Sequence, residues 1–152
     1  MKTLRCITAL FVCVALLSCG AARQNAVRIQ QSSAQVTVAS LADSVWVFSQ
    51  AHPEGYTLHL ATWSEPREGI AVAYEETQSR HDRKDLEFVI SHALEHDGFI
   101  GGWFNEEDGR YYFDSDRLFP EDSLAQALAF AKSNHQLAVY ILSSGTEIRV
   151  EQ

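Results

Sequence analysis

The clearest alternation of apolar and polar positions lies in residues 98–116, which also hold the densest run of aromatic side chains in the chain. Two short apolar segments there flank a polar segment that ends in Asp108-Gly109. Asp-Gly between two alternating apolar segments is a strong signal for a β-hairpin, because these residues accept the positive φ angles of a tight turn. The pattern therefore predicts a hairpin with residues 106–109 as its loop.

This loop pairs Trp103 with Tyr112 and Asn105 with Arg110, and successive side chains then point to opposite faces. The apolar face, which we expect in the core, holds Ile100, Phe104, Tyr111 and Phe113. The other face holds Gly101, Trp103, Asn105, Arg110, Tyr112 and Asp114. Its aromatic pair either packs under a second layer or forms a platform for a ligand or partner, since exposed aromatic pairs often mark interaction sites. Trp63, in a polar loop, either extends that platform or fills the core.

Hydrophobic periodicity also predicts the remaining elements. Alternation predicts strands at residues 44–49, 56–61, 70–74 and 146–150, and residues 137–142, which are apolar on both faces, predict a central strand. Apolar positions at i, i+3 and i+4 predict a helix at residues 83–97, with Gly98 as a left-handed C-cap, and a helix at residues 120–134, with Asn134 as a C-terminal stop. The resulting order is β-β-β-α-β-β-α-β-β. Because hairpin connections dominate, we expect an α+β fold with a largely antiparallel sheet of about six to seven strands and both helices on one face. The Trp103 and Tyr112 face would then be open unless the N-terminal segment or another sheet covered it.

The first 18 residues read as a signal peptide. Lys2 and Arg5 precede an almost wholly apolar run at residues 7–17, which is short for a mature transmembrane helix. The run ends in Leu16-Leu17-Ser18-Cys19, which resembles the lipobox of bacterial lipoproteins. The resemblance implies cleavage before Cys19, lipidation of that cysteine and, with Gly20 after it, attachment to the outer membrane. Two alternatives are cleavage at Gly20-Ala21-Ala22, which gives a soluble exported protein, and a retained membrane anchor.

Composition agrees with a lipid tether. Cys6 and Cys13 fall in the leader, so Cys19 is the one cysteine of the mature chain and forms no intramolecular disulfide. All 20 acidic residues lie beyond the leader, which contains Lys2 and Arg5, so the mature chain has a formal charge of about −10. Such a charge repels nucleic acids and anionic headgroups, and membrane attachment would depend on the lipid.

The domain organisation that follows has three parts. We expect residues 1–18 as the signal peptide, residues 19–42 as the lipidated cysteine with a flexible tether rich in Gln, Ser and Ala, and residues 43–152 as a single globular domain. No motif points to an organic cofactor, since no phosphate-binding loop is present. No G-x-S-x-G motif marks a nucleophilic serine either.

Two sequence patterns suggest metal chemistry. His92-Ala-Leu-Glu95-His96 has the H-x-x-E-H spacing of inverted zinc peptidases, in which two imidazoles bind Zn²⁺ and the glutamate acts as base. The same residues also suit the polar rim of an amphipathic helix. The acids of the hairpin tip could bind Ca²⁺, although their consecutive placement differs from an EF-hand loop.

Three functions remain open at this point. The favoured one is a non-catalytic binding or interaction module that is tethered by lipid in the cell envelope and uses Trp103, Tyr112, Asn105, Arg110 and Trp63. The alternatives are a small zinc-dependent hydrolase and a purely structural envelope lipoprotein.

Overall fold

The computed structural model describes residues 37–151, which form one compact unit. The leader, Cys19 and most of the expected tether lie outside the described residues, so the expectations about them stay predictions. Within residues 37–151 no helix combines the length and the apolar character that a bilayer crossing requires.

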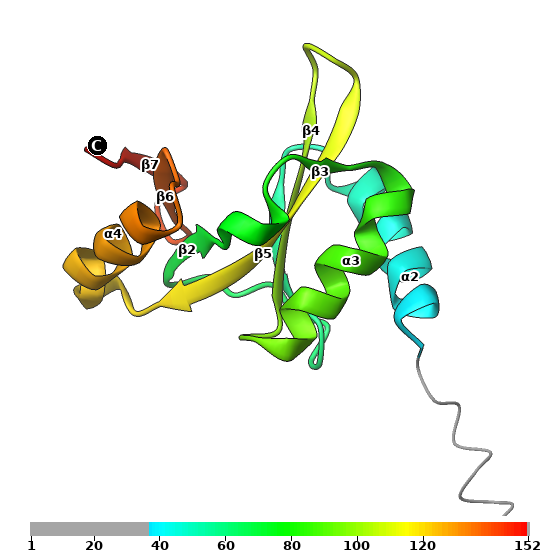
Figure 1. Cartoon of the computed structure of the whole chain (residues 1–152), viewed down its shortest axis with the longest axis horizontal. Coiled ribbons are helices and arrows are strands. Elements are labelled where there is room, and N and C mark those ends of the chain that lie inside the picture. The colour runs from blue at the N-terminus through cyan, green and yellow to red at the C-terminus, as the bar shows by residue number, and fades with distance from the viewer. Residues whose placement is uncertain (1–36, 152) are drawn as a thin grey trace, which may run out of the picture. The chain divides into compact units, whose positions relative to one another are not determined.

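A seven-stranded sheet forms the centre of the described unit, and every strand pairing in it is antiparallel. In spatial order the strands are β1 (Tyr56–His59), β4 (Phe99–Asn105), β5 (Arg110–Phe119), β2 (Ile70–Ala73), β6 (Ala138–Ile141) and β7 (Thr146–Arg149), with the short β3 (Arg80–His81) beside β5. The hairpin of β4 and β5 is the longest element of the sheet and projects beyond its neighbours (Figure 1). The predicted antiparallel α+β class is confirmed.

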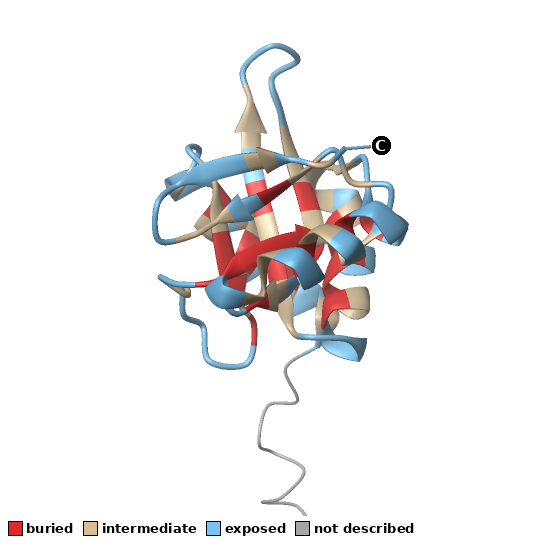
Figure 2. Ribbon diagram, turned by 90° about the vertical axis from the view of Figure 1, so that its left-hand side faces the viewer, coloured by how far each residue is buried: buried red, intermediate tan, exposed pale blue. Residues whose placement is uncertain are grey.

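All three described helices cover the same face of this sheet: α2 (Val38–Ala51), α3 (Asp82–Glu95) and α4 (Leu124–Ser133). Phe113 of β5 belongs to a core cluster with residues of α2 and α3, and Phe119 belongs to a second cluster with Ala127 and Ala131 of α4. Phe113 and Phe119 are six residues apart on one strand, so their side chains point to the same side. Figure 2 shows the buried residues gathered where the helices meet the strands. The prediction that the helices share one face is therefore confirmed.

The predicted strand at residues 44–49 is wrong, because these residues belong to helix α2. Thr37 caps this helix, accepting from the Ser40 N–H at 3.1 Å, and the Ser40 side chain accepts from the Thr37 N–H in return. Ala42, Val45 and Ser49 are its buried positions, with the spacing of a helical stripe. The helix begins at Val38, inside the range assigned to the tether. The observed order is therefore α-β-β-β-α-β-β-α-β-β.

The other predicted elements are present with shifted ends. Gly98 has the expected left-handed conformation, with φ +77°, and its N–H donates to the Ala93 carbonyl at 2.8 Å, although the C-cap position of α3 is His96. Asn134 caps the end of α4 as expected. Strand β6, expected at the sheet's centre, lies next to the edge strand β7, and its Tyr140 is exposed.

Candidate functional site on the outer face of the hairpin

The β4–β5 hairpin has the predicted register. Trp103 pairs with Tyr112, Phe104 with Tyr111 and Asn105 with Arg110. We call the side of the hairpin away from the helices the outer face; it consists of Phe99, Gly101, Trp103, Asn105, Arg110, Tyr112, Asp114 and Asp116. These eight residues form four successive cross-strand pairs, which run from Asn105 and Arg110 near the loop to Phe99 and Asp116 in the sheet.

The aromatic pair of the outer face is a stack. The rings of Trp103 and Tyr112 lie 5.2 Å apart between centroids with 20° between their planes, and 45% of Trp103 is exposed. The Tyr112 hydroxyl donates to Asp108 Oδ2 at 2.6 Å, and this bond is the main reason why the pKa of Tyr112 is raised. The stack is thus held at one end and leaves an aromatic surface accessible to solvent.

The two polar residues predicted for this site are engaged within the protein. Asn105 accepts from the Glu107 N–H at 3.0 Å, which supports the turn. Arg110 Nη1 donates to His81 Nε2 at 3.2 Å, and His81 Nδ1 donates to Asp82 Oδ2 at 2.9 Å. The His81 ring also packs edge-on to Tyr112, at 5.8 Å. These contacts therefore fix the hairpin tip and the Tyr112 ring.

Trp63 does not join this surface. It lies in the loop after β1 and packs edge-on to Phe48 of α2, at a centroid distance of 6.0 Å. Phe48 in turn contacts His52 and Tyr56, so Trp63 belongs to an aromatic group beside the helix α2. Its exposed fraction is 42%. The sequence predicted that Trp63 either extends the aromatic platform or fills the core. The structure shows an intermediate position, because Trp63 does not extend the hairpin stack and is not fully buried.

The outer face also contains two acidic residues that are removed from solvent, which the aromatic pattern of the sequence did not indicate. Asp114 is paired with Gly101, and Asp116 is paired with Phe99. Asp116 is only 6% exposed and Asp114 is partly buried. Burial raises the pKa of Asp114 to about 6, and burial together with the nearby Asp114 raises the pKa of Asp116 well above its ordinary value.

Gly101 makes room for the Asp116 carboxylate. A Cβ atom at Gly101 would lie 2.5 Å from Asp116 Oδ2, so only glycine leaves the carboxylate where it is. Among the described residues, neither Asp114 nor Asp116 has a side-chain hydrogen bond or a salt bridge. Carboxylates that are largely removed from solvent are costly to ionise, and titratable groups with perturbed pKa values are concentrated at functional sites.

The zinc pattern on α3 does not form a converging ligand set. The rings of His92 and His96 stack face to face, with 3.9 Å between centroids and 10° between planes. An imidazole binds a metal in its own ring plane, so two parallel rings cannot direct their nitrogens at one ion. Glu95 is exposed, and no group of three His, Cys, Asp or Glu side chains in residues 37–151 is placed to hold a metal.

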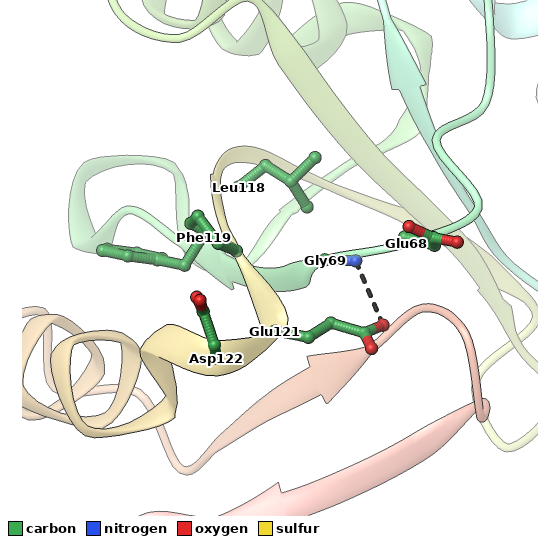
Figure 3. Close-up of a pocket in the computed structure, with 7 residues that line it drawn as sticks. Glu68, Gly69, Leu118, Phe119, Glu121 and Asp122 are labelled. Carbon is green, nitrogen blue, oxygen red and sulfur yellow. Dashed lines mark hydrogen bonds between the residues drawn. The ribbon is translucent and has the colours of Figure 1, made fainter.

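A separate hollow of about 500 Å³ lies where β5 ends, lined by residues of the β1–β2 loop and of the turn that follows β5 (Figure 3). Glu121 accepts from the Gly69 N–H at 3.3 Å, and hydrogen bonds from Ser143 and Gly69 lower the pKa of Glu121. These bonds connect three chain segments. The acids around the hollow are exposed, so it offers no buried polar group to a ligand.

No protein-family model matches the chain, and neither does any curated protein or any solved structure.

Proposed function

We propose that this protein is a non-catalytic binding module that lipid on Cys19 holds in the bacterial cell envelope, at the outer membrane. Its ligand site is the outer face of the β4–β5 hairpin. The observation that carries the proposal is the half-exposed Trp103–Tyr112 stack beside Asp114 and Asp116, two acids of raised pKa that form no salt bridge within residues 37–151.

The arrangement of the helices supports this assignment. All three pack on the opposite side of the sheet, where they bury the apolar residues of both core clusters. The stack therefore contributes little to the core, yet aromatic side chains are the residues that most often anchor a bound partner. A face that keeps large rings accessible at the expense of core burial is more useful for binding than for stability.

The hairpin also suits ligand recognition because strand pairing fixes the positions of its side chains. Its two strands are paired over seven residues each, from Phe99–Asp116 to Asn105–Arg110. Side chains on paired strands have defined positions, so a ligand meets a preorganised surface and little conformational entropy is lost on binding.

A photo-crosslinking experiment in cells that produce the protein tests the proposed site. A benzoylphenylalanine residue in place of Trp103 is expected to give an adduct of discrete mass after irradiation. The same residue in place of Val47, which is 66% exposed on α2, is the matched control. Equal adduct formation at both positions, or none at Trp103, would contradict the proposal and favour a purely structural role.

The tether is tested separately by mass spectrometry of the N-terminal peptide, where acyl chains on Cys19 are expected. A Cys19→Ser variant should be recovered in the soluble envelope fraction, because two or more acyl chains are needed for lasting attachment. Recovery of the unmodified peptide from the native protein would contradict the tether without affecting the proposed site.

A further inference from the structure

Among residues 37–151, no basic side chain forms a salt bridge with Asp114 or Asp116 of the outer face. The basic residues on β5 are Arg110 and Arg117. Arg110 lies at the tip and donates to His81, whereas the Arg117 guanidinium lies over the Phe119 ring on the helix side, 5.0 Å from its centroid. Neither arginine forms a salt bridge with Asp114 or Asp116.

The β1 residues on this side of the sheet do not form a salt bridge with the acids either. His59 of β1 is on the same side of the sheet, but Phe99 lies between it and Asp116 in the strand order. The His59 ring packs on Phe99 at 4.7 Å and its Nδ1 is bonded to the Thr62 hydroxyl at 2.7 Å. Thr57, next to Gly101 on β1, is 9% exposed and uncharged.

The geometry relates the acids directly to the aromatic stack. Tyr112, Asp114 and Asp116 are alternate residues of one strand, so each is about 7 Å from the next on the same face. Two carboxylates that accept hydrogen bonds thus lie within about 14 Å of a stacked indole and phenol. Carboxylates next to exposed aromatic rings are the combination that recognises organic cations, because the rings attract positive charge and cover the apolar part of the ligand.

Because no hydrogen-bond donor within residues 37–151 reaches the two carboxylates, we expect a ligand that brings its own N–H donors. A quaternary ammonium ion would supply charge but no hydrogen-bond donor, so it would displace water from the Asp116 carboxylate without replacing the hydrogen bonds of that water. An ammonium or guanidinium group supplies both, and a guanidinium additionally stacks on aromatic faces.

We infer, on the basis of the proposed function, that the outer face binds a small organic cation with N–H donors. The carboxylates of Asp114 and Asp116 accept its hydrogen bonds, and the Trp103–Tyr112 stack covers its aliphatic or planar part. The formal charge of about −10 on the mature chain favours the approach of such a ligand.

Isothermal titration calorimetry of the full chain tests the inference with two probes, agmatine for the guanidinium and putrescine for the ammonium. Tetramethylammonium is the control cation without N–H groups. At least one probe is expected to bind at pH 7.5, and Asp114→Asn and Asp116→Asn are each expected to weaken it at least tenfold. The Glu107→Gln variant removes an exposed acid of the same hairpin and should leave the affinity unchanged.

Three results would overturn the inference: no binding of either probe at millimolar concentration, equal binding of tetramethylammonium, or unchanged affinity in both Asp variants. The crosslinking result distinguishes a failure of this inference from a failure of the proposed function. If the probes do not bind while the crosslink at Trp103 persists, the outer face is a binding site for another class of ligand. If a probe binds and depends on Asp114 but no crosslink forms, the cation site is retained and the role of the ring stack is refuted.

Discussion

Replacing Asp114 with asparagine is expected to stabilise the protein at pH 8 and to leave its stability almost unchanged at pH 4. Asparagine has the same shape as a protonated aspartic acid but cannot ionise. Burial raises the pKa of Asp114 from its ordinary value of 3.8 to about 6. The folded state therefore binds more protons than the unfolded state between pH 4 and pH 6.

The sign of the effect follows from proton linkage. A carboxyl group with a raised pKa contributes its full stability below the unfolded-state pKa, and this contribution is lost as the pH rises through the folded-state pKa. Each unit of pKa difference corresponds to about 1.4 kcal/mol. The shift of Asp114 thus sets an upper limit of about 3 kcal/mol, and partial exposure of the side chain reduces the expected gain at pH 8 to about 2 kcal/mol.

Urea denaturation at pH 4, 6 and 8 measures this effect as the difference in the free energy of unfolding between the variant and the native chain. Glu107→Gln is the control, since it removes an exposed acid from the hairpin tip and should change the free energy of unfolding by less than about 0.5 kcal/mol at every pH. Destabilisation by Asp114→Asn at pH 8 would refute the reasoning, because it would mean that the carboxylate is stabilised by partners in the folded state.

Three further predictions concern the surroundings of the site and the core, each measured by urea denaturation. Gly101→Ala should destabilise the protein by about 1–3 kcal/mol, because the new Cβ would displace the Asp116 carboxylate. This loss of stability should largely disappear in an Asp116→Ala background. If it persisted in full there, the close approach of Asp116 to residue 101 would be contradicted. Phe113→Ala should cost about 3–5 kcal/mol, because this ring is fully buried between α3 and the sheet; a cost under 1 kcal/mol would contradict that packing. Thr37→Ala should cost about 1 kcal/mol through loss of the α2 cap, whereas an unchanged stability would show that the capping bonds are not formed in solution.

The hairpin could be predicted from the sequence because its signals are local. Asp108-Gly109 specifies the turn, and the alternation of aromatic and polar residues on both sides specifies the register. The same alternation placed Asp114 on the outer face. It could not show that Asp114 and Asp116 are buried without partners, because burial depends on segments that are distant in sequence.

Helix α2 was missed for a physical reason. The segment Ser44–Ser49 alternates valine with aromatic residues, which favours a strand over six residues, but a helix of 14 residues is decided by its cap and its buried stripe. The capping box formed by Thr37 and Ser40 is the signal that could have identified it. Ser49, a polar residue, occupies a buried position of that stripe because its hydroxyl is bonded to the Val45 carbonyl and the Tyr56 hydroxyl, each at 2.7 Å.

Spacing on a helix correctly placed His92 and His96 on one side, but it could not predict how the rings turn. Their stacked rings pack against Tyr74, whose hydroxyl donates to Asp97. Burial and the neighbouring His96 lower the pKa of His92, which favours a neutral imidazole in this packing. The histidine pair is thus accounted for by side-chain packing against Tyr74, the residue that follows β2.

A chemical-shift titration of the ¹⁵N-labelled protein with agmatine tests whether the outer face of the hairpin binds an organic cation. We expect saturable shifts of the backbone amides at Gly101–Trp103 and Tyr112–Asp116, with those of α4 unaffected and the response lost in Asp114→Asn. Shifts centred elsewhere, or a response that survives this substitution unchanged, would contradict this expectation.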